Sequence, residues 1–253
     1  MSPERPEDIF SRRAGFYATS KVHDDAVTLG RLVALASPRP EMGALDVGTG
    51  AGHTALALAP HVREVTAVDL TEAMMDQGRQ LARQRGVANV RFMHADAMEL
   101  PFPDGSFDLV TCRRAAHHFA DVRRAVGEMV RVLRPGGRLV LDDRTVPEDD
   151  AADEAINHLD RLHDPSHVRD HRPSEWRDIV SKVGLAVASL ELYARRMPLS
   201  HFTAMMEPAA ADEFRRYARQ LPDGLKALLN LRDEGGELFL DNFFVLLAAD
   251  KRA

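Results

Sequence analysis

The fold of this chain is decided by Ala44-Leu45-Asp46-Val47-Gly48-Thr49-Gly50-Ala51-Gly52-His53. A short apolar run ends in an acid, three glycines follow at every second position, and a helical pattern then begins. This order predicts a strand, a glycine loop and a helix, which open a nucleotide-binding α/β unit. The dinucleotide fingerprint G-x-G-x-x-G is not met, because His53 stands where its last glycine would be.

Outward from this stretch, strands alternate with helices over residues 43–142. Strands are expected at 43–47, 64–69, 90–94, 107–112 and 138–142, with helices at 53–60, 71–86 and 121–133. This alternation predicts a mostly parallel sheet with helices on both faces. Ligands of such sheets bind beyond the carboxyl ends of the strands. The polar residues expected at those ends are Asp46, Asp69, Asp96, Arg113 and Asp142.

The remaining segments complete one doubly wound, seven-stranded, Rossmann-like domain over 1–253. Helical patterns occupy 9–36 in two pieces after a frayed start at 1–8, and then 150–163 and 174–183. A sixth strand is expected at 186–193, and a seventh at 238–249 with a bend at Asp241-Asn242. A helical insertion, 199–234, separates these last two strands. We expect 1–36 to form a helical cover, 40–145 the cofactor-binding core, and 146–185 with 199–234 an acceptor-side cap.

Composition narrows the functional classes. The chain has 253 residues, a formal net charge of −6, 45% hydrophobic residues and one cysteine, Cys112. The net negative charge argues against a nucleic-acid partner, and a single cysteine cannot form a disulfide framework. We expect a cytoplasmic protein with neither a signal peptide nor a membrane span. The sequence leaves the oligomeric state open, a homodimer included.

Two acids at strand ends suggest an adenosine site. Asp69 comes 17 residues after Gly52, and a carboxylate there can accept both hydroxyls of a ribose. Asp96 ends the next strand, where it can accept from an adenine amino group while the Ala97 N–H serves a ring nitrogen. The structural alternatives are a solvated strand-end acid for Asp69 and a turn cap for Asp96.

Together these residues resemble the class I S-adenosylmethionine-dependent methyltransferases, in particular the ubiquinone/menaquinone-biosynthesis-like C-methyltransferase family. The resemblance covers about residues 40–145. The runs that carry it, in order, are Leu45-Asp46-Val47-Gly48-Thr49-Gly50-Ala51-Gly52, Val68-Asp69-Leu70-Thr71, Ala95-Asp96-Ala97, Leu100-Pro101-Phe102, Phe107-Asp108-Leu109-Val110, His117-His118-Phe119 and Arg131-Val132-Leu133-Arg134-Pro135-Gly136-Gly137-Arg138-Leu139.

The resemblance implies a set of cofactor-binding residues. It implies that the loop with Gly48, Thr49, Gly50 and Gly52 holds the methionine portion of S-adenosylmethionine, and that Asp46 before it also contacts the cofactor. It implies that Asp69, with Leu70 beside it, holds the ribose and that Asp96 with Ala97 holds the adenine. Arg113 takes the place near the amino-acid end of the cofactor.

The acceptor side is less family-like, and its candidates keep structural alternatives. Met205 and Met206 in the insertion line an apolar acceptor pocket or pack as ordinary core. His163 and His167 form a polar pocket wall or lie in a solvated loop. We expect no metal site in the histidine-rich run 163–171, because its spacing matches no compact ligand pair and Pro165 interrupts it.

Residues near the strand ends include candidates for a general base and for a nucleophile. His117, His118 and Asp142 are candidates for a general base, while the two histidines equally suit capping or packing of the next helix. Cys112 reads as a small buried residue, because the proline that precedes the nucleophile in pyrimidine C5 methylation is absent. Tyr17, in the N-terminal segment, is a further candidate for cofactor contact.

The sequence thus predicts a methyltransferase that uses S-adenosylmethionine and releases S-adenosylhomocysteine. The expected acceptor is a small hydrophobic or aromatic metabolite, methylated on carbon or oxygen. Two alternatives remain at this point: a non-catalytic S-adenosylmethionine-binding protein and an NAD-dependent oxidoreductase.

Overall fold

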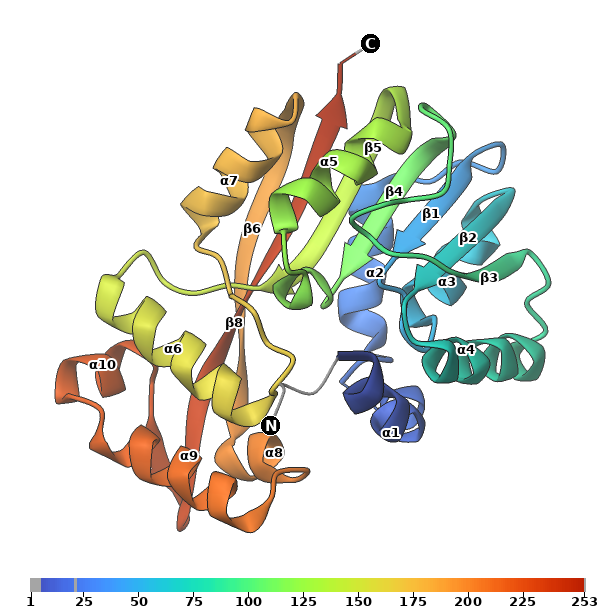
Figure 1. Ribbon diagram of the computed structural model, residues 1–253. Coiled ribbons are helices and arrows are strands. Elements are labelled where there is room, and N and C mark those ends of the chain that lie inside the picture. The colour runs from blue at the N-terminus through green and yellow to red at the C-terminus, as the bar shows by residue number, and fades with distance from the viewer. Residues whose placement is uncertain (1–5, 21, 253) are drawn as a thin grey trace.

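A computed structural model describes residues 6–20 and 22–252 (Figure 1). Its centre is one sheet of eight strands in the order β3-β2-β1-β4-β5-β8-β6, with β7 added on β8. The strands from β3 to β5 are parallel, whereas β8 runs antiparallel to both β5 and β6. The predicted mostly parallel α/β sheet is therefore confirmed.

The strand count differs from the predicted seven because a short strand lies inside the predicted helical insertion. The strands are β1 (Gly43–Val47), β2 (Glu64–Asp69), β3 (Val90–His94), β4 (Phe107–Arg113), β5 (Leu133–Arg144), β6 (Leu185–Pro198), β7 (Arg232–Glu234) and β8 (Glu237–Lys251). β7 forms a hairpin with β8 through the turn at Gly235 and Gly236. β8 continues through Asp241-Asn242, where the sequence predicts a bend, and both residues pair with β6.

The helices follow the predicted pattern closely. They are α1 (Pro6–Thr19), α2 (Ala26–Ala36), α3 (His53–Leu58), α4 (Glu72–Arg85), α5 (Val122–Val132), α6 (Asp150–His163), α7 (Pro173–Lys182), α8 (Leu199–Thr203), α9 (Pro208–Gln220) and α10 (Asp223–Leu228), with short 3₁₀ turns η1 (Ala59–His61) and η2 (Ala116–His118). The predicted frayed start 1–8 is wrong at Pro6–Asp8, which form the first turn of α1; residues 1–5 lie outside the described residues.

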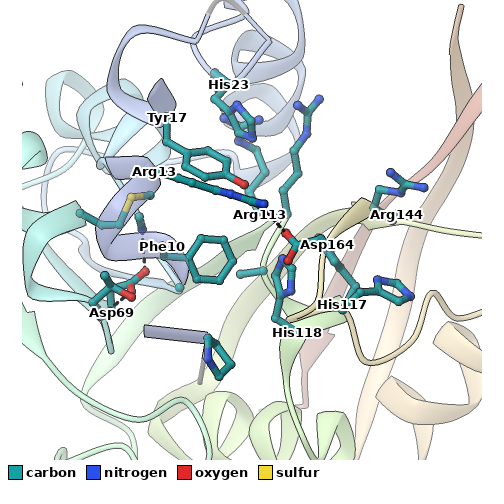
Figure 2. Close-up of a pocket in the computed structure, with 18 of the residues that line it drawn as sticks. Phe10, Arg13, Tyr17, His23, Asp69, Arg113, His117, His118, Arg144 and Asp164 are labelled. Atoms are coloured by element: carbon teal, nitrogen blue, oxygen red, sulfur yellow. Dashed lines mark hydrogen bonds and ion pairs between the residues drawn. The ribbon is translucent and has the colours of Figure 1, made fainter. Parts of the chain in front are cut away.

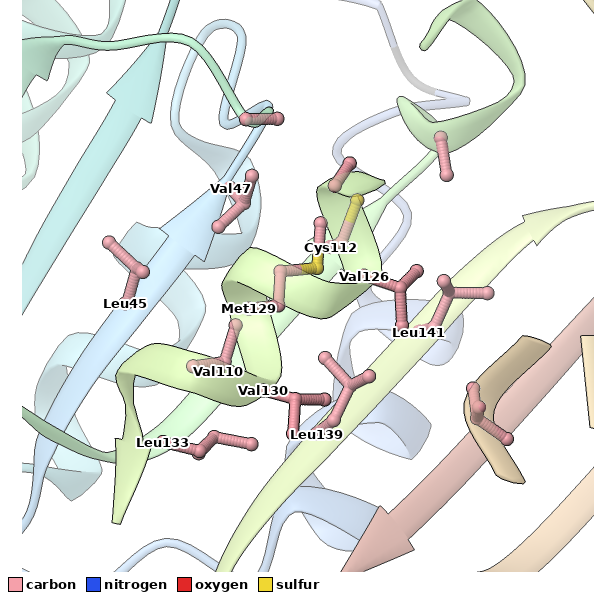
Figure 3. Packing of buried hydrophobic residues seen from close by; sticks show 14 of the residues in the cluster. Leu45, Val47, Val110, Cys112, Val126, Met129, Val130, Leu133, Leu139 and Leu141 are labelled. Carbon is pink, nitrogen blue, oxygen red and sulfur yellow. The ribbon is translucent and has the colours of Figure 1, made fainter. Parts of the chain in front are cut away.

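Successive side chains of the central strands point to opposite faces of the sheet, and a hydrophobic core forms on each face. Leu45 and Val47 of β1 pack on the face covered by α5, which contributes Met129 (Figure 3). Trp176 of α7 belongs to the same core. Ala44 points to the opposite face, where residues of α2 and α3 cover it. Cys112 is fully buried in the first core, as its sequence context indicates.

A third apolar cluster lies beyond the end of the sheet. It joins α6, α8, α9 and α10 to the first half of β8, with Phe202, Phe214 and Leu240 among its buried members. In Figure 1 these helices gather on one side of the strand ends and α1 lies on the other. No helix among the described residues is long and apolar enough to span a membrane.

Candidate active site

The glycine loop is shaped by backbone conformation and close packing. Gly48 and Gly52 have φ values of 64° and 81°, in the region that side-chain-bearing residues avoid. A Cβ added at Gly48 would lie 2.4 Å from the Ala115 Cβ, and one at Gly52 would lie 2.8 Å from the Phe92 ring. Gly48, Thr49 and Gly50 line a cavity at the strand ends, whereas Gly52 caps α3 and is not among the lining residues.

Asp46 lies beneath this loop and does not line the cavity. Its Oδ2 accepts a 2.6 Å hydrogen bond from Thr49 Oγ1, and its Oδ1 accepts one of 2.7 Å from Thr111 Oγ1. The residue is 1% exposed, and burial raises its pKa to about 6. This position makes Asp46 an anchor for the loop, so its predicted contact with a cofactor would be indirect.

Asp69 connects the loop to the next strand end. Its Oδ2 accepts from the Gly50 N–H and its Oδ1 accepts from the Thr71 N–H, both at 2.8 Å. Burial raises the pKa of Asp69, while these N–H groups act in the opposite direction. Two backbone bonds leave lone pairs free on a carboxylate that lines the cavity, so it retains the capacity to accept hydroxyl groups.

Asp96, the predicted adenine-binding acid, lines the same cavity as Asp69. Asp96 Oδ1 accepts from the Met98 N–H at 2.8 Å, so the predicted turn-capping role is present. Asp96, Ala97 and Leu70 all line the cavity, and so does Arg113. The structure therefore gathers the predicted residues of three successive strand ends around one space.

One cavity of about 490 Å³ joins the glycine loop to the acceptor-side segments. This volume is typical of small-molecule sites. Its wall continues from Asp69 and Asp96 past His117 and His118 to residues of α6, α8 and β8. Phe10, Arg13 and Tyr17 of α1 cover it, and Figure 2 shows their side chains between Asp69 and the two histidines.

His117 forms a dyad with an acid that the sequence reasoning missed. The His117 Nδ1 lies 2.5 Å from Asp143 Oδ1, and Asp143 Oδ2 accepts from the N–H of Ala116 at 2.7 Å. Burial raises the pKa of Asp143, but the His117 charge and hydrogen bond outweigh it and the pKa falls below its usual range. Asp143 is fully buried and does not line the cavity, whereas His117 does.

The sequence profile of the family described as "Methyltransferase domain" matches residues 45–141. The "Uncharacterized methyltransferase YcgJ" of Bacillus subtilis is 48% identical over 191 residues, which are 76% of this chain and 74% of the relative. Its crystal structure has a TM-score of 0.86 at 38% identity and covers 90% of this chain and 99% of the other. This chain belongs to the class I S-adenosylmethionine-dependent methyltransferases.

This methyltransferase is also similar to a second solved structure and to a quinone methyltransferase. A crystal structure from Bacillus halodurans, assigned as a methyltransferase, has a TM-score of 0.87 at 30% identity and covers 90% of this chain and 100% of the other. The demethylmenaquinone methyltransferase of Thermus thermophilus is 45% identical over 113 residues, 44% of this chain and 51% of the relative. The predicted resemblance is confirmed, and the methyltransferase class decides against the NAD-dependent and non-catalytic alternatives.

The other two base candidates of this methyltransferase have different surroundings. His118 lines the cavity, packs edge-on against Phe10, and has its Nδ1 3.2 Å from the Ser166 carbonyl oxygen. Burial first and His117 second lower its pKa to about 3, which keeps its ring neutral. Asp142 does not line the cavity; its Oδ1 accepts a 2.7 Å hydrogen bond from the Tyr193 hydroxyl on the opposite face of β5 from Asp143. Its position gives it no direct access to an acceptor.

Three of the four predicted acceptor-pocket residues line the cavity. His163 and His167 do so, and His163 Nδ1–H donates to the Phe202 carbonyl at 2.6 Å. Met205 also lines it, whereas Met206 packs against the third apolar cluster instead. Each neutral histidine is held by a hydrogen bond, so these rings form a fixed wall.

Of Phe10, Arg13 and Tyr17 in α1, which cover the cavity, Tyr17 is a predicted candidate for cofactor contact, whereas Phe10 and Arg13 were not predicted. Phe10 and Tyr17 contact each other edge-on, with ring centroids 5.8 Å apart. Arg13 Nη1 lies 3.5 Å from Asp164 Oδ2, which ties α1 to the loop after α6 (Figure 2). Phe10 and Tyr17 are seven residues apart, which is two helical turns. This spacing indicates that they share one face of the helix, but it does not say which surface that face covers.

One group of potential metal ligands occurs among the described residues. Ligand atoms of Asp160, His167 and Asp170 lie within 4.8 Å of one another. The Arg144 guanidinium is hydrogen-bonded to Asp160, and its Nε lies 3.3 Å from Asp170 Oδ2. Because the Arg144 guanidinium is already paired with both carboxylates, we assign no metal to this group.

Proposed function

We propose that this methyltransferase methylates carbon or oxygen of a small hydrophobic or aromatic acceptor. The observation that carries the proposal is the single cavity, which runs without a break from Asp69 and the glycine loop to His117 and the aromatic residues beyond it. Methyl transfer needs donor and acceptor in one enclosed space at a fixed angle, and a continuous cavity meets that need.

The part of the cavity lined by the glycine loop, Asp69 and Asp96, here called the cofactor lobe, fits S-adenosylmethionine. When bound, this cofactor supplies an electrophilic methyl group on a positively charged sulfur. Asp69 has free lone pairs for ribose hydroxyls, and Asp96 lies beside it for the adenine amino group. Arg113 is 8% exposed, and its Nη1 has no hydrogen-bond partner among the described residues. A carboxylate such as that of the methionine portion would satisfy it.

The part of the cavity beyond His117 and His118, here called the acceptor lobe, suits an apolar acceptor. Its lining includes Phe202, Met205 and Phe244, with Phe10 reaching in from α1. A demethylated menaquinone is the acceptor named for the Thermus relative, which supports an aromatic acceptor here. We propose that α1 covers this part of the cavity and that residues 146–185 with 199–234 cap it. α2, the second piece of the predicted cover 1–36, packs instead on the sheet face that carries Ala44.

His117 is our candidate for the general base. Its Nδ1–H donates to Asp143, so its Nε2 carries a lone pair in the neutral ring. Nε2 would take the proton that an acceptor O–H or acidic C–H loses as the new bond to the methyl group forms. Asp143 is a positioning residue that fixes the tautomer and stabilises the protonated ring.

The test is transfer of a labelled methyl group from S-adenosylmethionine to a panel of phenols, hydroquinones and enolisable ketones. We expect label in at least one extracted acceptor, and roughly 10²- to 10⁴-fold slower transfer by H117Q. If S-adenosylhomocysteine binds but no panel member is labelled, the proposed acceptor class is wrong.

A further inference from the structure

Five arginines line the cavity, and they fall into two groups. Arg13, Arg144 and Arg195 each contact a carboxylate within ion-pair distance, and their acidic partners include Asp164, Asp160 and Asp25. Arg113 and Arg114, at the end of β4, have no such ion pair among the described residues. The unpaired positive charge of the cavity is thus concentrated at two consecutive residues.

Neutral groups hold these two guanidinium groups in place. Arg113 Nε donates to Thr54 Oγ1 at 3.0 Å, and its Nη2 donates to the His23 carbonyl. Arg114 Nη1 donates to the Val22 carbonyl at 3.1 Å. Arg113 Nη1 and Arg114 Nε and Nη2 are buried without a hydrogen-bond partner among the described residues. Each such N–H is costly unless a ligand completes it.

Local backbone geometry brings both side chains to one cavity. Consecutive strand residues point to opposite faces, but Arg114 leaves the strand with φ of 52°. Its N–H donates to the Asp142 carbonyl at 2.7 Å, which fixes the turn. The Arg114 guanidinium lies over the Phe244 ring, 4.8 Å from its centroid. The charge is therefore held against an aromatic wall of the acceptor lobe.

The surrounding acids leave room for a bound anion. Burial raises the pKa of Asp142, and the charges of Arg114 and Arg113 act in the opposite direction. Asp142 Oδ1 accepts from the Tyr193 hydroxyl, its Oδ2 has no hydrogen-bond partner, and it forms no ion pair with either arginine among the described residues. Under the proposed function, the cofactor carboxylate satisfies Arg113. Arg114 then remains as a partly buried cation whose Nε and Nη2 are buried without a hydrogen-bond partner among the described residues. Planar guanidinium donors match a carboxylate in geometry and charge.

We propose that the methyl acceptor carries a carboxylate, which binds at Arg114 while its apolar part contacts Phe244. This inference rests on the proposed function and names its substrate class as aromatic or otherwise apolar acids.

The experiment compares acids with their neutral amides on protein saturated with S-adenosylhomocysteine, so that Arg113 is already occupied. The probes are benzoate against benzamide and 4-hydroxybenzoate against 4-hydroxybenzamide, titrated to about 10 mM by ligand-observed NMR. Variants are R114Q, which removes the charge, and R114K, which retains it. R219Q is the control for net charge, because Arg219 is exposed on α9.

The wild type and R219Q should bind each acid at least about tenfold more tightly than its amide. R114Q should lose this preference, R114K should retain part of it, and all four proteins should bind S-adenosylhomocysteine alike. Equal binding of acid and amide, no acid binding at 10 mM, or an undiminished preference in R114Q would each overturn the inference. Failure to bind S-adenosylhomocysteine would instead count against the proposed function.

Discussion

Asp143 holds the His117 ring by a 2.5 Å contact between Oδ1 and Nδ1, from a fully buried position behind the cavity wall. The same carboxylate accepts from two backbone N–H groups, of Ala116 and His117, through Oδ2. The acid is thus fixed to the 3₁₀ turn that carries the histidine, which links the orientation of the ring to the end of β5.

This dyad predicts that D143N lowers kcat of methyl transfer by roughly 10²-fold or more. The acceptor KM and the S-adenosylhomocysteine dissociation constant should stay within about threefold, because Asp143 does not line the cavity. D142N is the matched comparison, since Asp142 is equally buried on the adjacent position of β5. If D142N lowers kcat as much as D143N does, Asp143 does not have the specific positioning role proposed for it.

Replacing Asp69 should weaken cofactor binding. D69A removes a carboxylate that lines the cavity and also frees the Gly50 N–H, so we expect the dissociation constant for S-adenosylhomocysteine to rise roughly 10- to 100-fold. D76A is the control, because Asp76 is an exposed acid on α4 that pairs with Arg79. Calorimetric titration of both variants gives the answer; an unchanged constant in D69A removes the ribose assignment.

Gly48 should tolerate no side chain. G48A combines a φ of 64° with a Cβ 2.4 Å from the Ala115 Cβ, and the backbone term alone costs about 1 kcal/mol. G86A isolates that backbone term, because Gly86 has φ of 67° and no heavy atom within 4 Å of an added Cβ. Urea unfolding should therefore show G48A less stable than G86A. Equal stabilities would mean that the contact with Ala115 relaxes freely.

Buried neutral His118 should make stability fall on mild acidification. Its folded pKa of about 3 lies below the value of about 6.5 for an unfolded chain, so only the unfolded state gains a proton as the pH drops below 6.5. This residue alone should remove about 1 kcal/mol of the free energy of unfolding between pH 7.5 and 5.5. H118N, which cannot titrate, should show a correspondingly smaller loss in urea unfolding. The same loss in both proteins would contradict a neutral buried ring.

Local sequence was sufficient for Gly48, Thr49 and Gly50 of the loop and for the strand-end acids Asp69 and Asp96, because one strand–loop–helix unit places each of them. It was insufficient for Asp143. Along β5, Val140 packs with the α2 face and Leu141 with the α5 face, so Asp142 points away from η2 and Asp143 points toward it. The sequence shows this alternation but not which face carries the histidine.

The remaining misses have a similar cause. Phe10 and Arg13 reach the cavity through contacts between distant parts of the chain, which periodicity does not reveal. Met205 and Met206 are neighbours on one segment, and only the packing of α8 against α9 decides that Met205 alone reaches the cavity.

The central claim is that one cavity holds the cofactor at the strand ends and presents its methyl group toward His117. A crystal structure with S-adenosylhomocysteine tests it most directly. We predict the ribose on Asp69, the adenine beside Asp96, and the sulfur facing the lobe lined by His117 and Phe244. Density for the ligand outside this cavity, or with its sulfur turned away from His117, would contradict the account.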